Sequence, residues 1–394
     1  MKKTSSQGVY ILDGARTIIG NPYKSLRPYS SAQLGAVVIS ELVNRHRIRK
    51  NQVNGVILGN VVSAGAGQNI ARQAVMAAGL SSATAAFTVN NVCGAGLQAV
   101  ISGAQAILAQ DADLVICGGA ESATHAPYIA DKDDIDKHKP SAWKDSILTD
   151  GLFCAMSQKR MGDLAEKLSQ QHRISRQEQD RYAFRSHNNA AAAQREGKLR
   201  VEIVPLKDSN GAVITKDDRP RASLTLEALS ALPPAFAKPG SVTSGNSSSP
   251  CDGAAAVLLA SSKALANSKF RPKARILGYA SIATDPALTF ETISLVIQAC
   301  LSKTKLTVKD IGLFEISEAF SAQMIFAVRK AKIPEDRLNV CGGDIAFGHP
   351  LGAAGARILV TLINSLIDRR KRVGLACVSY GGGGALGVVI ENLT

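Results

Sequence analysis

Two residues of this 394-residue sequence stand where a nucleophile and its proton acceptor would be expected. The first, Cys93, follows a strand-like run and precedes the small residues of VNNVCGAGLQ, which predict the start of a helix. At such a position the helix dipole and the free N–H groups favour a thiolate, and the N–H of Cys93 could help to hold an oxyanion. The alternative is an inert, buried cysteine, the usual fate of this residue type.

The second is His349, in GDIAFGHPLGAAGAR, between a glycine and a proline that constrain its loop. A neutral imidazole there can take a proton from a thiol or donate a hydrogen bond to a carbonyl oxygen. A lone histidine is more often a surface or capping residue, which this constrained turn disfavours. Glu318, in ISEAFSAQ, is either a paired structural charge or a third site residue.

Near the C-terminus, GLACVSYGGGGALG places Cys377 and Ser379 just before four consecutive glycines. Because successive side chains alternate along a strand, both residues belong to one strand face, roughly 6.5 Å apart. A serine hydroxyl is a far weaker base than a thiol near neutral pH. Which of the two faces the site therefore decides what proton chemistry it can support.

The elements that must position these residues show an internal likeness. Two stretches, residues 93–119 and 349–384, share one order of elements. In each, a reactive residue precedes a helix rich in Gly and Ala, and a strand that ends in glycines follows the helix. In the second stretch, Ile358, Leu362 and Leu366 form one apolar stripe. The pattern predicts a duplicated α/β half, with two unrelated βα units as the alternative.

Between the halves the sequence is more polar. Residues 161–173 and 175–198 predict two polar helices among proline-containing connections. Such a long insertion is expected to cover the active-site face of an α/β core. We therefore divide the chain into an N-terminal half (1–121 with 250–273), an inserted loop domain (122–249) and a C-terminal half (274–394).

The composition limits the kinds of molecule that this protein is expected to bind. The net charge of +14 comes without a nucleic-acid motif, so we expect no nucleic acid and favour a phosphate-bearing small molecule or a merely solvated basic surface. No apolar stretch is expected to reach the ~18 residues that span a bilayer, and the N-terminus does not resemble a signal peptide. Seven cysteines without CxxC spacing predict reduced thiols, a cytoplasmic protein and no metal site.

Several blocks together resemble the thiolase family, in order and over essentially the whole chain: GQNIARQAVMAAGL, NNVCGAGLQ, ESATHAPY, SVTSGNSSSPCDGAAAV, SEAF, GHPLGAAGARI and GGGG. The resemblance is strongest to the short-chain, biosynthetic-type acetyl-CoA acetyltransferases. It implies a thiolase fold of two duplicated halves in a five-layered αβαβα core, with an inserted loop domain that binds coenzyme A. It also implies ping-pong acyl transfer, a homodimer or homotetramer, acetyl-CoA or other short acyl-CoA substrates, and coenzyme A as substrate and product without a permanently bound cofactor.

The same resemblance implies roles for individual residues. Cys93 corresponds to the nucleophile that carries the acyl group, and His349 to its activator and an oxyanion donor. The N–H groups of Cys93 and Gly381 would form a second oxyanion hole. The remaining matches concern the ligand. Ser248 corresponds to the serine that contacts the pantetheine arm, and Arg221 to an arginine near the nucleotide of coenzyme A. Met161 and Phe320 correspond to residues that line the acyl pocket.

Three positions depart from the family pattern. Ser379 stands where the family has its acid/base cysteine, whereas Cys377 would take that place only with an altered strand end. Ser317 replaces the asparagine that holds a water beside the histidine, and Arg160 stands where related sequences often carry histidine near the pantetheine.

These departures leave three functions open. The first is acetyl-CoA C-acetyltransferase activity, in which two acetyl-CoA condense to acetoacetyl-CoA and thiolysis reverses the reaction. The second is a non-condensing thioesterase or acyltransferase that retains Cys93 and His349 but lacks the carbanion step. The third is a thiolase-like subunit that binds coenzyme A without turnover.

Overall fold

The computed structural model describes residues 8–136 and 142–394. Its centre is a nine-stranded mixed sheet in the order β13-β14-β15-β12-β1-β11-β4-β2-β3. The strands are β1 (Val9–Arg16), β2 (Gly55–Gly59), β3 (Ala85–Val89), β4 (Leu114–Glu121), β11 (Gly253–Ser261), β12 (Ala274–Ala283), β13 (Leu313–Ile316), β14 (Val373–Tyr380) and β15 (Gly384–Asn392).

The sheet consists of two similar parts that meet at a narrow seam. Only two residue pairs join β1 to β12, Tyr10 with Arg275 and Ile11 with Ala274. On one side β1, β11 and β4 are antiparallel neighbours, and β4, β2 and β3 run parallel. On the other side β12, β15 and β14 are antiparallel neighbours, and β14 and β13 run parallel. This repeated pattern confirms the predicted duplication.

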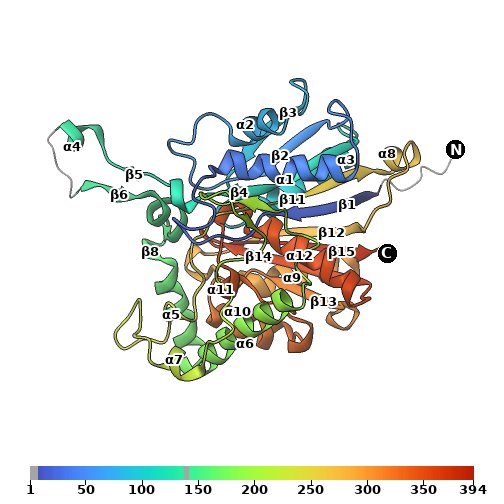
Figure 1. Cartoon of the computed structure of the whole chain (residues 1–394). Coiled ribbons are helices and arrows are strands. Elements are labelled where there is room, and N and C mark those ends of the chain that lie inside the picture. Colours follow the sequence, from blue (N-terminus) through green and yellow to red (C-terminus); the bar gives the residue numbers. More distant parts are fainter. Residues whose placement is uncertain (1–7, 137–141) are drawn as a thin grey trace.

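Helices complete five layers. Helices α3 (Ala95–Leu108) and α12 (Ala354–Asp368) pack together between the two parts of the sheet. The outer helices are α1 (Ser31–Arg45) and α2 (Ile70–Ala77) on the N-terminal part, and α9 (Thr292–Thr304) and α10 (Ser321–Ala331) on the C-terminal part. Figure 1 shows α1 and α2 in the upper part of the molecule and α9 and α10 in the lower part. The predicted αβαβα order is therefore correct.

Small residues let α3 and α12 approach closely, as the sequence predicted. A Cβ atom on Gly96 would lie 2.7 Å from the carbonyl oxygen of Gly352 and 3.0 Å from the amide nitrogen of Ala356. A Cβ atom on Gly355 would lie 2.7 Å from Cβ of Leu97. These distances are shorter than van der Waals contact, so a larger residue at either position would force the neighbouring backbone to shift.

One expectation about apolar length is wrong. The helical segment Leu351–Asp368 has 18 residues and a mean hydropathy of 1.4, which is long and apolar enough to cross a bilayer. However, 83% of this segment is buried within the fold. Its apolar side chains on all sides reflect its place between two sheets, where a core helix has no solvent-facing side.

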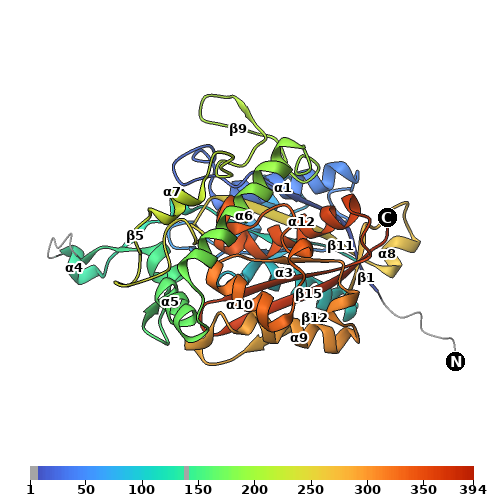
Figure 2. The same ribbon diagram turned by 90° about the horizontal axis from the view of Figure 1, so that it is seen from below.

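The inserted region contains the two predicted polar helices, α5 (Met161–Gln171) and α6 (Arg176–Arg195), which pack against α10 (Figure 2). A hairpin of β5 (Tyr128–Ile129) and β6 (Lys144–Asp145), with α4 (Lys132–Asp136) at its tip, projects from the body (Figures 1 and 2). The other short elements are β7 (Phe153–Cys154), β8 (Lys159–Arg160), β9 (Leu206–Lys207), β10 (Val213–Ile214), α7 (Leu226–Ser230), α8 (Ser262–Ala266) and α11 (Asp344–Phe347).

The domain division by residue number stays a proposal. It is supported by β11, which follows the inserted region and returns to the N-terminal part of the sheet between β1 and β4. The next strand, β12, lies in the C-terminal part. The chain thus leaves the N-terminal half after β4 and re-enters it at β11, in agreement with residues 122–249 as an insertion.

Candidate active site

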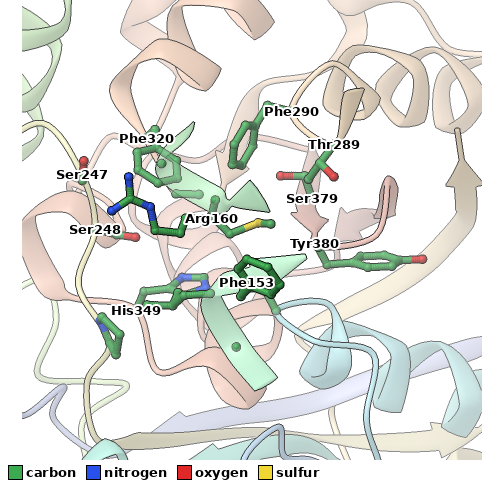
Figure 3. Close-up of a pocket in the computed structure, with 18 of the residues that line it drawn as sticks. Phe153, Arg160, Ser247, Ser248, Thr289, Phe290, Phe320, His349, Ser379 and Tyr380 are labelled. Atoms are coloured by element: carbon green, nitrogen blue, oxygen red, sulfur yellow. The ribbon is translucent and has the colours of Figure 1, made fainter. Parts of the chain in front are cut away.

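A cavity of about 550 Å³ opens where the two halves and the inserted region meet. Its reactive side chains are Cys93, His349 and Ser379, and its walls are mainly apolar. Figure 3 shows His349 and Ser379 at this cavity together with the rings of Phe153, Phe290 and Phe320. A concave apolar site with a few polar groups is typical of a small-molecule binding site.

The turn before α3 presents Cys93 to the cavity. Helix α3 begins at Ala95, two residues after Cys93, as predicted. Val92 has a φ of 48°, a strained conformation for a β-branched residue. The turn is held by hydrogen bonds from the amide of Gly94 to the carbonyl of Asn91 (3.0 Å) and from Ala95 to Val92 (2.9 Å). Cys93 is partly exposed, whereas the other six cysteines are buried.

His349 is held by its backbone and its ring. Its amide donates to the carbonyl of Ser249 (2.8 Å), and its own carbonyl accepts from the amide of Cys251 (3.3 Å). Gly348, with a φ of 99°, forms the turn before it. Nδ1 lies 3.1 Å from Oδ2 of Asp344. Nε2 is buried and has no hydrogen-bond partner of ordinary geometry in the described ranges 8–136 and 142–394.

The charges around His349 favour its imidazolium form. Burial alone lowers the pKa of His349, but the charge of a Cys93 thiolate and the hydrogen bond with Asp344 raise it to about 10. The structure thus places an imidazole that accepts a proton readily beside the thiol that can give one. This is the pairing that the sequence predicted.

Asp344 was not identified from the sequence, although a charge five residues before the histidine in an apolar run was a usable signal. Its carboxylate is fully buried and contacts three side chains: His349, Arg357 and Ser317. Burial alone raises the pKa of Asp344, but the guanidinium of Arg357 and the imidazole of His349 hold it well below its usual range. The carboxylate is therefore charged.

Ser317, which stands where the family has a water-holding asparagine, lies behind the imidazole of His349. Its hydroxyl donates a hydrogen bond of 2.5 Å to Oδ2 of Asp344, and it is absent from the cavity lining. Its observed role is to hold Asp344.

Ser379 and Cys377 are separated by their surroundings in β14. Ser379 lines the cavity, and its Oγ accepts a hydrogen bond of 3.2 Å from Nε2 of Gln323. Cys377 has no exposed surface and lies in the core with Cys300 of α9. Burial, with a smaller effect of Cys300, raises the pKa of the Cys377 thiol well above its usual range. Cys377 is thus buried outside the cavity, which argues against it as the alternative catalytic residue.

Most residues that the sequence assigned to ligand binding reach the cavity. Ser248, Arg160, Met161, Phe320 and Gly381 line it. Arg160 forms an ion pair of 2.7 Å with Asp163 and stacks on Phe236, with 5.2 Å from its guanidinium carbon to the ring centroid. This side chain therefore helps to shape one wall of the cavity.

Arg221 does not line the cavity. It is exposed, and its amide donates to Nδ1 of His187 at 3.3 Å. A residue that contacts only the nucleotide end of a long ligand would lie beyond the cavity that holds the reactive end, so its predicted role stays a prediction.

Of the two roles predicted for Glu318, the contacts support that of a paired structural residue. Its buried carboxylate accepts hydrogen bonds from Tyr182 (2.9 Å), Ser186 (2.6 Å) and Asn339 (2.8 Å). It is absent from the cavity lining. Burial raises its pKa despite these bonds. Glu318 thus ties the inserted region to the C-terminal half.

Within the described part of the chain, no three His, Cys, Asp or Glu side chains are grouped as a metal site would require.

Comparisons with known proteins agree with this geometry. Residues 9–263 match the thiolase N-terminal domain and residues 270–392 the thiolase C-terminal domain. The chain is 42% identical over 388 residues to an acetyl-CoA acetyltransferase of Escherichia coli K12, covering 97% of this chain and 98% of the relative.

Solved structures give the same result. Human mitochondrial 3-ketoacyl-CoA thiolase superposes with a TM-score of 0.95 at 33% identity, covering 98% of this chain and 99% of the other. The Acat5 thiolase of Ascaris suum, solved in complex with coenzyme A, superposes with a TM-score of 0.92 at 35% identity, covering 98% and 100%. With both domain models matched along nearly its whole length, the chain belongs to the thiolase family.

Proposed function

We propose that this thiolase is an acetyl-CoA C-acetyltransferase that condenses two acetyl-CoA to acetoacetyl-CoA and coenzyme A and catalyses the reverse thiolysis. One observation carries the proposal: Cys93, the only cysteine of seven that is not buried, shares an apolar cavity with His349. The E. coli relative named acetyl-CoA acetyltransferase supports the same activity. The comparisons favour it over a non-condensing acyltransferase or a subunit without turnover.

In the first half-reaction, Cys93 is the nucleophile. Nε2 of His349 accepts the thiol proton, and the thiolate attacks the carbonyl carbon of acetyl-CoA. The backbone N–H groups of Cys93 and Gly381 are proposed to stabilise the oxyanion. The tetrahedral intermediate then expels coenzyme A as a thiolate, which takes the proton from the imidazolium. An acetyl thioester on Cys93 and free coenzyme A result.

In the second half-reaction, the alkoxide of Ser379, formed by loss of its proton to solvent, takes a proton from the α-carbon of another acetyl-CoA, and the resulting carbanion attacks the acetyl thioester. The proton given to solvent is returned to the Cys93 thiolate that this step releases. A new carbon–carbon bond forms, and the Cys93 thiolate is released. Ser379 occupies the acid/base position of this step in our proposal, because it lines the same cavity as Cys93 and His349. Its weakly acidic hydroxyl makes this the slow step.

Coenzyme A would enter between the inserted loop domain and the C-terminal half. Ser248 is proposed to contact the pantetheine arm, Arg160 to lie beside it, and Arg221 to approach the nucleotide phosphates. Met161 and Phe320 would hold the acyl group, since both line the apolar part of the cavity. The net charge of +14 favours such a polyphosphate ligand.

The chain is further proposed to form a homodimer or homotetramer. Strand β3 is an edge of the nine-stranded sheet, and Phe87 in this strand is 51% exposed. An open edge with a large apolar side chain is suited to pairing with a second copy. All seven cysteines are unpaired, which supports the proposed cytoplasmic location.

Intact-protein mass spectrometry after incubation with acetyl-CoA tests the proposal. We expect one acetyl adduct, assigned to Cys93 by peptide mapping, that disappears on addition of coenzyme A. The variant Cys93→Ser is the matched control and should not form a thiol-cleavable adduct. An unmodified wild-type protein, together with no thiolysis of acetoacetyl-CoA, would rule out both enzymatic functions.

A further inference from the structure

The carboxylate behind His349 points to a part of the reactive centre outside the cavity. We propose that Asp344 is a positioning residue that fixes the ring and tautomer of His349, so that Nε2 exchanges protons with Cys93. The inference rests on the proposed pairing of Cys93 with His349 and adds a third member to it. Asp344 touches the reaction only through the imidazole.

The first argument is geometric. Oδ2 of Asp344 lies 3.1 Å from Nδ1 of His349, and both residues are buried. A charged carboxylate can only accept a hydrogen bond, so Nδ1 must carry a proton. In the neutral ring this leaves Nε2 as the acceptor. Nε2 is the nitrogen that has no ordinary hydrogen-bond partner in the described chain and that belongs to a cavity-lining side chain.

The second argument is that Asp344 is itself held. Arg357 of α12, fully buried, donates to Oδ1 of Asp344, while Ser317 donates to Oδ2. Arg357 also donates to Oε1 of Glu315 in β13 (3.1 Å). The two oxygens of Asp344 therefore divide their contacts: one binds the guanidinium, and the other serves the imidazole. A carboxylate fixed in this way can orient a ring without rearranging.

The third argument concerns charge. The ionisable groups that act on His349 are Asp344 from α11 and Cys93 from the turn before α3. Behind Asp344 stand Arg357 of α12 and the carboxyl groups of Glu315 and Glu318 at the end of β13. Because the guanidinium neutralises part of this negative charge, Asp344 stays ionised although it is buried. Its charge stabilises the imidazolium that forms when Cys93 loses its proton.

Alkylation of Cys93 by iodoacetamide tests the proposal without any acyl-CoA. Rates are measured from pH 5 to 11 for the wild type, for Asp344→Asn and for Glu315→Gln. Asparagine keeps the shape and an acceptor oxygen but removes the charge. Glu315→Gln is the matched control, because it alters the other carboxyl bound by Arg357 without touching His349. Circular dichroism and urea unfolding check that the variants fold.

We expect Asp344→Asn to lower the alkylation rate at pH 7 by about tenfold or more. Its rate profile should shift upward by about 1 to 3 pH units, the usual effect of one close charge. The control should keep the wild-type profile. An unchanged profile in folded Asp344→Asn, or an equal shift in both variants, would overturn the proposal, since the effect would then not pass through the contact with His349.

A second measurement uses the wild type alone and holds even if Asp344→Asn does not fold. In protein labelled with ¹⁵N-histidine, the resonances of His349 are assigned by their loss in His349→Gln. We expect Nδ1 to remain protonated from pH 6 to 9. A neutral ring protonated at Nε2 would contradict the proposal. Neither experiment depends on acetyl transfer, so a missing acetyl adduct would count against the proposed function only.

Discussion

Replacing Ser379 with cysteine should accelerate the carbon–carbon step of this thiolase. Ser379 lines the same cavity as Cys93 and His349, so a thiol there would face bound substrate. The side chain lies next to open cavity, which gives the larger sulfur space. The change weakens the hydrogen bond that Oγ accepts from Gln323, at a cost of about 0.5–1.5 kcal/mol in stability.

The size of the gain follows from acidity. A thiol has a pKa of about 8.5, whereas an aliphatic hydroxyl ionises about as weakly as water, so its pKa lies far above that of a thiol. General acid–base catalysis contributes roughly 10²–10⁴-fold to a proton-transfer step, so we expect a gain of about 10³ from the more acidic thiol.

The assay is thiolysis of acetoacetyl-CoA, followed as kcat/KM for the wild type, Ser379→Cys and Cys377→Ala. The last variant is the control for a thiol in the same strand. Because Cys377 is fully buried in the core, its removal should leave the rate within about twofold of the wild type. If Ser379→Cys gains nothing and Cys377→Ala abolishes thiolysis, then Cys377 is the base and our reasoning from burial fails.

Two further predictions concern stability. Burial, together with the charges of the nearby Arg221 and Arg219, lowers the pKa of His187 to about 4. As the pH falls below about 6.5, the unfolded chain binds a proton at this histidine, whereas the folded chain binds it only near pH 4. Stability should fall by roughly 3 kcal/mol across this window, and urea unfolding of His187→Gln should show a flatter profile; equal slopes would contradict this. Gly96→Ala should lose about 1–3 kcal/mol, because its Cβ meets backbone atoms at 2.7 and 3.0 Å. The control Gly55→Ala, whose Cβ would lie 3.7 Å from its nearest neighbour, the carbonyl oxygen of Ala85, should keep the wild-type stability, and equal losses in both variants would refute the packing argument.

The sequence was most informative where the backbone conformation or close packing requires a particular residue type, such as glycine. Glycines around Cys93 and His349 indicate close packing, and the repeated order of strand, reactive residue and helix predicted the duplicated halves. Both residues reach one cavity because each stands just before a helix of the middle layer. Local patterns of this kind need no knowledge of distant contacts.

Other features depended on contacts between distant segments. Strand periodicity placed Cys377 and Ser379 on one face, but only the packing of α9 and the opening of the cavity assign one to the core and the other to the site. Similarly, Ser317 and Asp344 are 27 residues apart in sequence and meet only in the fold. The role of Ser317 could not be derived from its type, since the same hydroxyl could have bound water.

Because six cysteines are buried and one is partly exposed, the number of cysteines that react with a thiol reagent reports how much of the chain has unfolded. Brief labelling with a small thiol reagent should add a single tag to intact molecules, and complete denaturation should add seven. The positions of the tags would identify which half opens first, because Cys117 lies in β4 of the N-terminal half, whereas Cys300 in α9 and Cys377 in β14 belong to the C-terminal half. Separate unravelling of the halves would then appear as two distinct bursts of labelling.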